Sequence, residues 1–185
     1  MSLGHSFESV LGAARTGQEW AWEVIYRELA PPVLGYLRAR GAAEPEDLTG
    51  EVFLQLVRDL SGFEGGEREF RTWVFTVAHH RLIDERRRRG RRPIESRPTE
   101  YLANEEVGGD AEAEGLARIE EGQVRGLLGR LSEDQQSVLL LRVLGDLTVE
   151  QVARVLGSTP GAVKALQRRG LAALKREIWR LGVTL

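Results

Sequence analysis

The apolar residues of this chain recur at helical spacing almost from end to end. In the N-terminal half the pattern is interrupted by two single glycines, by a proline pair and by a glycine-rich loop. It therefore predicts five helices, over residues 7–15, 18–29, 33–40, 44–60 and 70–87. Pro31 and Pro32 separate the second helix from the third, because proline lacks an amide proton but fits the first turn of a new helix.

The C-terminal half continues as a row of predicted helices. After a helix over 119–130, Ser132 and Gln135 form a capping box at the start of the next one, and Thr148 and Gln151 repeat that signature. A last helix begins near residue 160, where a threonine precedes a proline. No segment alternates apolar and polar residues as a strand does, so the predicted fold class is all-α.

The predicted helix over 70–87 is amphipathic. Its apolar sector consists of Phe70, Trp73, Val74, Val77, Ala78 and Leu82. The opposite side is polar and increasingly basic, and it consists of Thr72, Thr76, His79, Ile83 and Arg86. One side suits a protein core, and the other suits a polyanion such as a nucleic acid. For the arginine run at its end, taken alone, a solvated helix terminus is an equally good interpretation.

Charge is segregated along the chain, although the net charge is only −2. Residues 81–97 hold eight arginines against three acids, and residues 162–185 hold six lysines or arginines against one acid. Between them, residues 98–121 hold eight acids against one arginine. These blocks predict two anion-binding surfaces joined by a self-repelling connector. The prolines and paired glycines of the connector predict a flexible linker.

Composition excludes several classes of protein. The chain has no cysteine, which excludes disulfides and cysteine-based zinc sites. It has neither a signal peptide nor an apolar run of about 20 residues, so we expect a cytoplasmic protein without membrane insertion. No P-loop, H-E-x-x-H or G-x-S-x-G motif occurs, so we expect neither enzymatic activity nor a cofactor. His79 and His80 diverge by about 100° on a helix, so no metal site is expected.

Residues 147–175 have the pattern of a short helix, a glycine-containing turn and a long basic helix. One side of the long helix is apolar and consists of Val163, Leu166, Gly170, Leu174, Ile178 and Leu181. The other side carries cations among very small residues, namely Gly161, Lys164, Ala165, Arg168, Arg169, Ala172, Lys175 and Arg176. Small residues let a helix sit deep in the major groove while its cations reach phosphates or guanine edges. The pattern predicts a DNA-binding helix-turn-helix.

Two unrelated motifs together resemble one family. The segments EPEDLTGEVFLQLVRDL and FRTWVFTVAHHRLIDERRRR resemble two helices of the σ2 domain of extracytoplasmic-function (ECF, group IV) RNA polymerase sigma factors. The segment LSEDQQSVLLLRVLGDLTVEQVARVLGSTPGAVKALQRRGLAALK resembles the σ4 domain of the same family. The resemblance implies a σ2-like bundle over 1–93 and a σ4-like helix-turn-helix domain over 118–185, joined by a linker over 94–117.

The resemblance implies a transcription initiation factor that directs core RNA polymerase to specific −35/−10 promoters. Its polymerase contacts would be the β′ clamp helices and the β flap. The residues implied for the β′ clamp helices are Asp47, Leu48, Glu51, Val52, Phe53 and Leu56. An alternative is that Leu48, Val52 and Leu56 simply pack in the core, which we expect for one or two of them. An anti-sigma factor is a further expected partner, because a free sigma factor would expose apolar docking surface.

The resemblance also implies residues that contact promoter DNA. The loop at 61–69 and the helix after it would capture the −10 element through Phe63, Thr72, Trp73, Thr76, His79, His80 and Arg86. Trp73 is the natural base-stacking candidate, but its place on the apolar sector favours core packing. The −35 element would be contacted in the major groove by Gly161, Lys164, Ala165, Arg168 and Arg169, with Arg142 on a phosphate.

A departure from the family pattern leaves the promoter sequence open. Ala165 and Leu166 stand where the family often has a Ser-Arg pair.

Two other functions stay open at this point: a stand-alone helix-turn-helix regulator and an adaptor that binds only protein. The acidic helix at 47–56 favours the sigma factor, since a self-contained regulator has no need of it.

Overall fold

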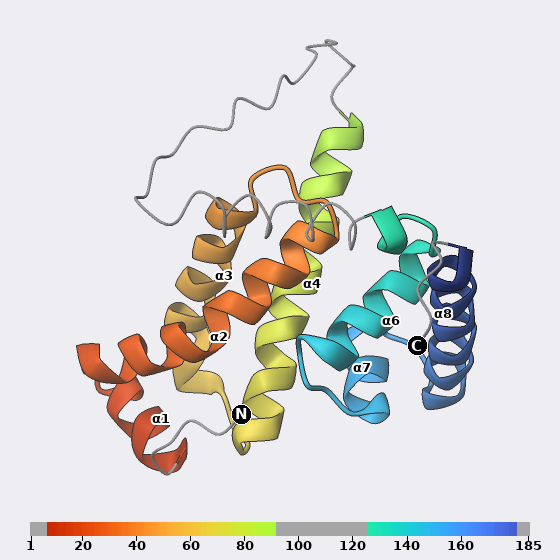
Figure 1. Ribbon diagram of the computed structural model, residues 1–185. Coiled ribbons are helices and arrows are strands. Elements are labelled where there is room, and N and C mark those ends of the chain that lie inside the picture. Colours follow the sequence, from red (N-terminus) through yellow and green to blue (C-terminus); the bar gives the residue numbers. More distant parts are fainter. Residues whose placement is uncertain (1–6, 92–125, 181–185) are drawn as a thin grey trace, which may run out of the picture.

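The computed structural model describes residues 7–91 and 126–180, and every regular element in these two ranges is helical, as predicted (Figure 1). The N-terminal helices are α1 (Phe7–Arg15), α2 (Glu19–Ala39), α3 (Pro45–Asp59) and α4 (Glu67–Arg91), with a short 3-10 turn, η1 (Leu60–Gly62), before α4. The C-terminal helices are α6 (Glu133–Val143), α7 (Val149–Val155) and α8 (Pro160–Arg180). The predicted linker over 94–117 and most of the predicted helix over 119–130 lie outside the described residues.

The proline pair does not break the chain. Helix α2 continues through Pro31 and Pro32, so the prediction of separate helices over 18–29 and 33–40 was wrong. The two prolines cost roughly 6 kcal/mol in a helix interior. Buried apolar side chains on both sides of the pair oppose this cost, namely Ile25, Leu29, Val33 and Leu37, together with the Tyr36 ring. At about 2 kcal/mol each, their burial contributes about 10 kcal/mol and favours one continuous helix.

The start of α4 is anchored by aromatic side chains. The Phe70 ring lies 5.6 Å from that of Phe7 and 5.3 Å from that of Phe63, between ring centroids. The helix begins at Glu67 rather than at the predicted residue 70. The Gly66 amide donates to the Glu69 carboxylate at 3.1 Å, which satisfies a donor that the helix terminus leaves free.

The turn between α6 and α7 is shaped by packing as well as by caps. Both predicted capping boxes are present, at Ser132 and at Thr148. Leu147 and Val152 flank the second cap at the positions of a hydrophobic staple, and both are 0% exposed. A Cβ at Gly145 would lie 2.6 Å from the carbonyl oxygen of Leu141, so this close approach of the chain requires glycine.

Helix α4 lies at the centre of the molecule. It packs against α3 on one side and against α7 on the other, while α8 lies on the outer side of the C-terminal helices (Figure 1). The buried apolar residues of the N-terminal and C-terminal helices form one continuous core. Both sides of α4 are therefore largely covered. No described helix combines the length and the apolarity that crossing a bilayer requires.

Candidate nucleic-acid interface

Helix α8 presents its basic face to solvent. Its inner side is fixed by Val163, which is fully buried, and by Gly170, where an added Cβ would lie 3.0 Å from a methyl carbon of Leu139. The predicted −35 residues on the outer side are exposed or half-buried, namely Gly161, Lys164, Ala165, Arg168 and Arg169. Small residues near the helix start and cations further along leave this face able to enter a groove and meet phosphates.

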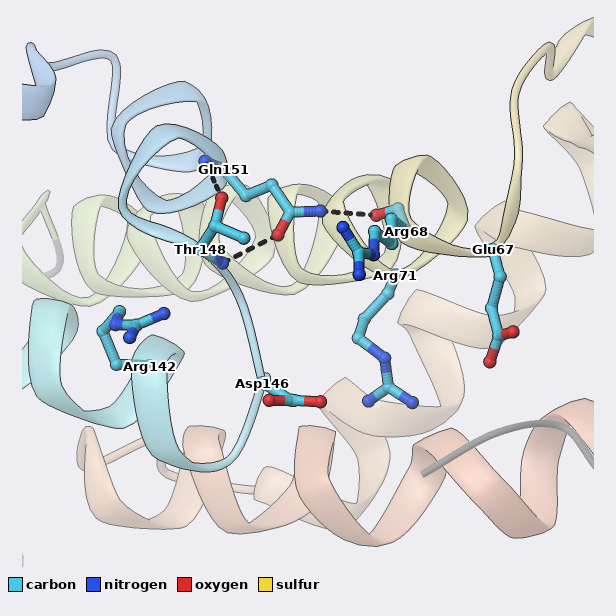
Figure 2. A pocket seen from close by; sticks show the side chains of 7 residues that line it. All are labelled: Glu67, Arg68, Arg71, Arg142, Asp146, Thr148 and Gln151. Carbon is cyan, nitrogen blue, oxygen red and sulfur yellow. Dashed lines mark hydrogen bonds between the residues drawn. The ribbon is translucent and has the colours of Figure 1, made fainter.

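Arg142 stands apart from the other −35 candidates. Its guanidinium donates to the carbonyl of Leu147, which ties the end of α6 to the chain entering α7. Figure 2 shows it on the wall of a cavity of about 410 Å³, which Arg68 and Arg71 of α4 line from the other side. Arg142 is therefore placed beside α4 and not on the outer face of α8. Its contact with a DNA phosphate stays a prediction.

The polar face of α4 meets the C-terminal helices. The side-chain amide of Gln151, in α7, donates to the Arg68 carbonyl at 3.0 Å (Figure 2). The same carbonyl accepts a hydrogen bond from the Thr72 hydroxyl at 2.7 Å. Thr72 is only 7% exposed, and Thr76, one turn further along, is half-buried. Two of the predicted −10 residues are thus covered in this arrangement.

Two further −10 candidates, His79 and Arg86, lie on the same side of α4. The Tyr36 hydroxyl lies 2.8 Å from Nδ1 of His79. Burial raises the pKa of Tyr36 to about 12, with Arg40 opposing the rise. Burial lowers the pKa of His79 to about 4, and the positive charges of His80, Arg40 and Arg86 act in the same direction. Both rings are therefore neutral near pH 7.

The lowered pKa of His79 predicts a loss of stability in mild acid. Between its ordinary pKa near 6.5 and about pH 4, His79 is protonated in the unfolded chain but stays neutral in the folded chain. The free energy of unfolding should therefore fall across this window, by about 2 kcal/mol after a discount for the partial exposure of the ring. Urea unfolding at pH 7.5 and pH 5 measures it, with His79→Gln compared with His80→Gln at its exposed neighbour. Equal pH dependence in both variants would contradict the assignment.

The remaining −10 candidates are placed differently. Trp73 is half-buried and stacks on Phe63, with centroids 5.2 Å apart and an interplanar angle of 17°. It also meets the edge of Phe70 at 5.7 Å. This packing agrees with the place of Trp73 on the apolar sector. His80 is exposed on the neighbouring surface.

The predicted polymerase-binding residues of α3 divide into core and surface. The apolar members are buried, with exposures of 6% or less: Leu48, Val52, Phe53 and Leu56. They belong to the core, as the alternative interpretation held for some of them. Asp47 is exposed and Glu51 is half-buried, with its carboxylate 3.5 Å from Arg81. The docking of α3 on polymerase stays a prediction.

Helix α3 carries an exposed apolar stripe that was not among the predicted site residues. Leu54 is 63% exposed and Val57 is 51% exposed. Both follow Glu51 on the outer side of the helix, where apolar residues interrupt a polar face. Tyr26 of α2, 52% exposed, packs on Phe53, the residue that precedes Leu54, with ring centroids 4.7 Å apart. The signal for this stripe was present in the sequence, since Leu54 and Val57 fall outside the apolar sector of their helix.

Arg40 is a second residue that the sequence did not single out. It follows the last residue of α2 and is only 3% exposed. Its guanidinium donates to the Gln136 side chain at 2.9 Å and lies 3.5 Å from the Glu133 carboxylate. These partners are more than ninety residues further along the chain. No local pattern could have indicated such a contact.

Comparison with known proteins agrees with this geometry. The Sigma-70 region 2 family model matches residues 25–92, and the Sigma-70 region 4 model matches residues 121–174. ECF RNA polymerase sigma factor SigD of Mycobacterium tuberculosis is 32% identical over 191 residues, which cover 97% of this chain and 87% of SigD. ECF RNA polymerase sigma factor BldN of Streptomyces coelicolor is 32% identical over 165 residues, 88% of this chain but only 62% of BldN.

A solved structure shares the fold. The structure of CnrH in complex with the cytosolic domain of CnrY superimposes with a TM-score of 0.67 over 93% of this chain and 96% of that one, at 19% identity. The match to region 2 removes the case for a stand-alone helix-turn-helix regulator, because it places a second sigma region on α2 to α4. The chain belongs to the ECF family of RNA polymerase sigma factors, and it is an alternative sigma factor.

Proposed function

We propose that this sigma factor uses three separate surfaces to bring core RNA polymerase to its promoters. The outer face of α8 reads the −35 element, the polar face of α4 captures the −10 element, and the outer face of α3 binds the polymerase. The observation that carries the proposal is the exposed basic face of α8, set by the burial of Val163 and Gly170 on the opposite side. RNA synthesis itself belongs to the polymerase.

On α8, Lys164, Arg168 and Arg169 contact guanine edges and phosphates of the −35 element, while Gly161 and Ala165 allow the helix to approach the bases. On α4, a single strand from the melted −10 element meets Thr72, Thr76, His79 and Arg86. His80 and the Phe63–Trp73 pair form the border of that surface. The hydroxyls and the imidazole hydrogen-bond to bases, and Arg86 holds a phosphate.

The polymerase surface comprises Asp47, Glu51, Leu54 and Val57 of α3, extended by Tyr26 of α2. Apolar anchors beside acidic groups suit a basic partner helix, because anchors provide most of the binding energy and charges provide orientation. An anti-sigma factor would cover the same stripe and so compete with the polymerase.

Removal of the exposed stripe tests this surface. The double variant Leu54→Ala and Val57→Ala should weaken binding of core polymerase roughly 30- to 700-fold, since each anchor contributes about 1–2 kcal/mol. Trp20→Ala removes a comparably exposed apolar side chain of α2 outside the stripe, and it should leave binding unchanged. Equal losses in both proteins, measured by fluorescence anisotropy, would refute the assignment.

The function as a whole is tested by transcription. Purified core polymerase with this chain should start transcripts from a subset of a randomised promoter library, and core polymerase alone should not. Tight binding of palindromic DNA by the chain alone, without any core-dependent initiation, would contradict the proposal.

A further inference from the structure

Helix α1 packs against the start of α4, although the match to region 2 begins only at residue 25. Figure 1 shows α1 beside the end at which α4 begins. The Phe7 ring lies 5.6 Å from the Phe70 ring, between centroids, and Val10 is 0% exposed. Helix α1 is therefore held at a fixed place next to the surface proposed to capture the −10 element.

The loop that leads into α4, residues 63–66, is joined to α1 by one side chain; it is called the entry loop below. The guanidinium of Arg15, the last residue of α1, donates to the carbonyl of Phe63. The Phe63 ring stacks on Trp73 and meets the edge of Phe70. The first residue of the entry loop is thus held by its ring from α4 and by its backbone from α1.

The other end of the entry loop is held by the first turn of α4. The Gly66 amide donates to the Glu69 carboxylate at 3.1 Å. Gly65 has a φ of 139°, and an added Cβ there would lie 2.7 Å from the Cβ of Glu69, so the loop requires glycine at this position. Glu64, between the two anchored ends, is exposed. The loop therefore has one anchor on α4 at Gly66 and a second one, through Arg15, on α1.

A hollow of about 670 Å³ lies between α1 and the entry loop. It is lined by Phe7, Glu8, Leu11 and Arg15 of α1 and by residues 64–67. Side chains do not fill the space behind the loop, so packing alone leaves the loop room to move. The hydrogen bond from Arg15 restrains it.

The composition of the entry loop makes such a restraint useful. Two of its four residues are glycine, which loses more conformational freedom on ordering than any other residue. If the loop became ordered only on binding DNA, the apparent affinity would fall in proportion to the fraction of molecules in the competent conformation. A loop that is anchored beforehand avoids this loss, which is the general benefit of preorganisation.

We propose that Arg15 is a positioning residue for promoter recognition, which holds the entry loop in the conformation that receives the melted −10 strand. The inference rests on the proposed capture of the −10 element at the start of α4. Arg15 acts through the backbone of Phe63 and touches no base. It therefore raises the affinity for preferred −10 sequences and leaves sequence-independent binding of DNA unchanged.

Two variants with unbranched side chains test this role. Arg15→Met has no hydrogen-bond donor, whereas Arg15→Lys retains a positively charged one. Holoenzymes made with each protein are titrated with two fluorescein-labelled single strands. One carries the −10 sequence that is transcribed best from the randomised promoter library, and the other has the same bases in scrambled order. Arg15→Met should bind the preferred strand about tenfold more weakly and the scrambled strand like the wild type, and Arg15→Lys should recover most of the loss.

A direct contact with a DNA phosphate is the alternative, because Arg15 is exposed. Loss of such a contact would weaken binding of both strands. It would also make the slope of log affinity against log salt shallower by about 0.7, the value for one phosphate of a single strand. A positioning residue leaves this slope unchanged. Equal losses on both strands, together with a shallower slope in Arg15→Met, would overturn the proposal.

Hydrogen exchange in the free, full-length chain gives a measurement that does not depend on DNA. The amides of Phe63 and Gly66 are both hydrogen-bonded, to Leu60 and to Glu69. They should exchange faster in Arg15→Met than in the wild type, while the amides of α3 keep their protection. Unchanged exchange in the entry loop would contradict the restraint. Faster exchange along the whole chain would also contradict it, because it would show a general loss of stability.

The matched control is Arg27→Met, which removes an exposed arginine of α2 and changes the net charge equally. It should bind both strands like the wild type, and an equal loss on the preferred strand would reduce the role of Arg15 to its charge. If the wild-type holoenzyme prefers the −10 strand and Arg15→Met prefers it just as strongly, the inference about Arg15 is wrong and the proposed function stands. If the wild-type holoenzyme binds both strands equally, the proposed −10 capture itself fails.

Discussion

Replacing Leu147 by alanine should lower the free energy of unfolding by about 2–4 kcal/mol. Leu147 is 0% exposed and forms the hydrophobic staple that sets the angle at which the chain enters α7. Its loss removes buried apolar surface and leaves a cavity between α6 and α7. Chemical unfolding followed by circular dichroism measures the change.

Leu171→Ala provides the matched comparison, because Leu171 is 51% exposed on α8 and its truncation should cost less than about 1 kcal/mol. If the two variants lose the same stability, the staple has no special role. Because the core is continuous across both helix groups, the Leu147 variant should unfold in one transition.

Removal of two cations from the outer face of α8 should have a comparably large effect on DNA binding. The double variant Lys164→Ala and Arg168→Ala should lose about 2–4 kcal/mol of affinity, roughly 30- to 700-fold, for duplex promoter DNA. The slope of log affinity against log salt should also become shallower, by up to about two phosphate contacts. Anisotropy titrations at several salt concentrations, on the promoter that the holoenzyme transcribes best, give both quantities.

The control removes two exposed cations from the N-terminal helices, Arg27 and Arg58, and lowers the net charge equally. It should retain most of the affinity. A similar loss in the control would mean that overall charge governs the binding, with no special role for the face of α8.

The helix starts of the C-terminal half could be predicted because the capping hydrogen bonds that define them are local. The Ser132 and Thr148 caps each depend on residues within one turn, and both are present. The prediction of two helices separated by the proline pair was wrong because the cause there is not local. The helical continuity of α2 comes from the burial of residues such as Ile25 and Tyr36 against other helices, which no local rule at Pro31 and Pro32 records.

The candidate sites divide in the same way. Exposure of Lys164 and Arg168 followed from the two-sided pattern of their helix. The cover over Thr72 and the partners of Arg40 depend on contacts between segments about eighty to one hundred residues apart, and periodicity carries no information about them. On α3, periodicity separates buried from exposed residues. The predicted polymerase-binding set nevertheless followed the family resemblance, so it included the buried Leu48 and Val52 and omitted the exposed Leu54.

The central position of α4 limits how this protein can change over evolutionary time. If Thr72 contributes to promoter choice as proposed, a substitution there changes two things at once, because its hydroxyl shares the Arg68 carbonyl with Gln151 of α7. Promoter preference and the packing between the two groups of helices are then inherited together. Under the proposed role of α8, new specificity is more readily acquired on its outer face, where Lys164 and Arg168 are exposed and a mutation leaves that packing as it was.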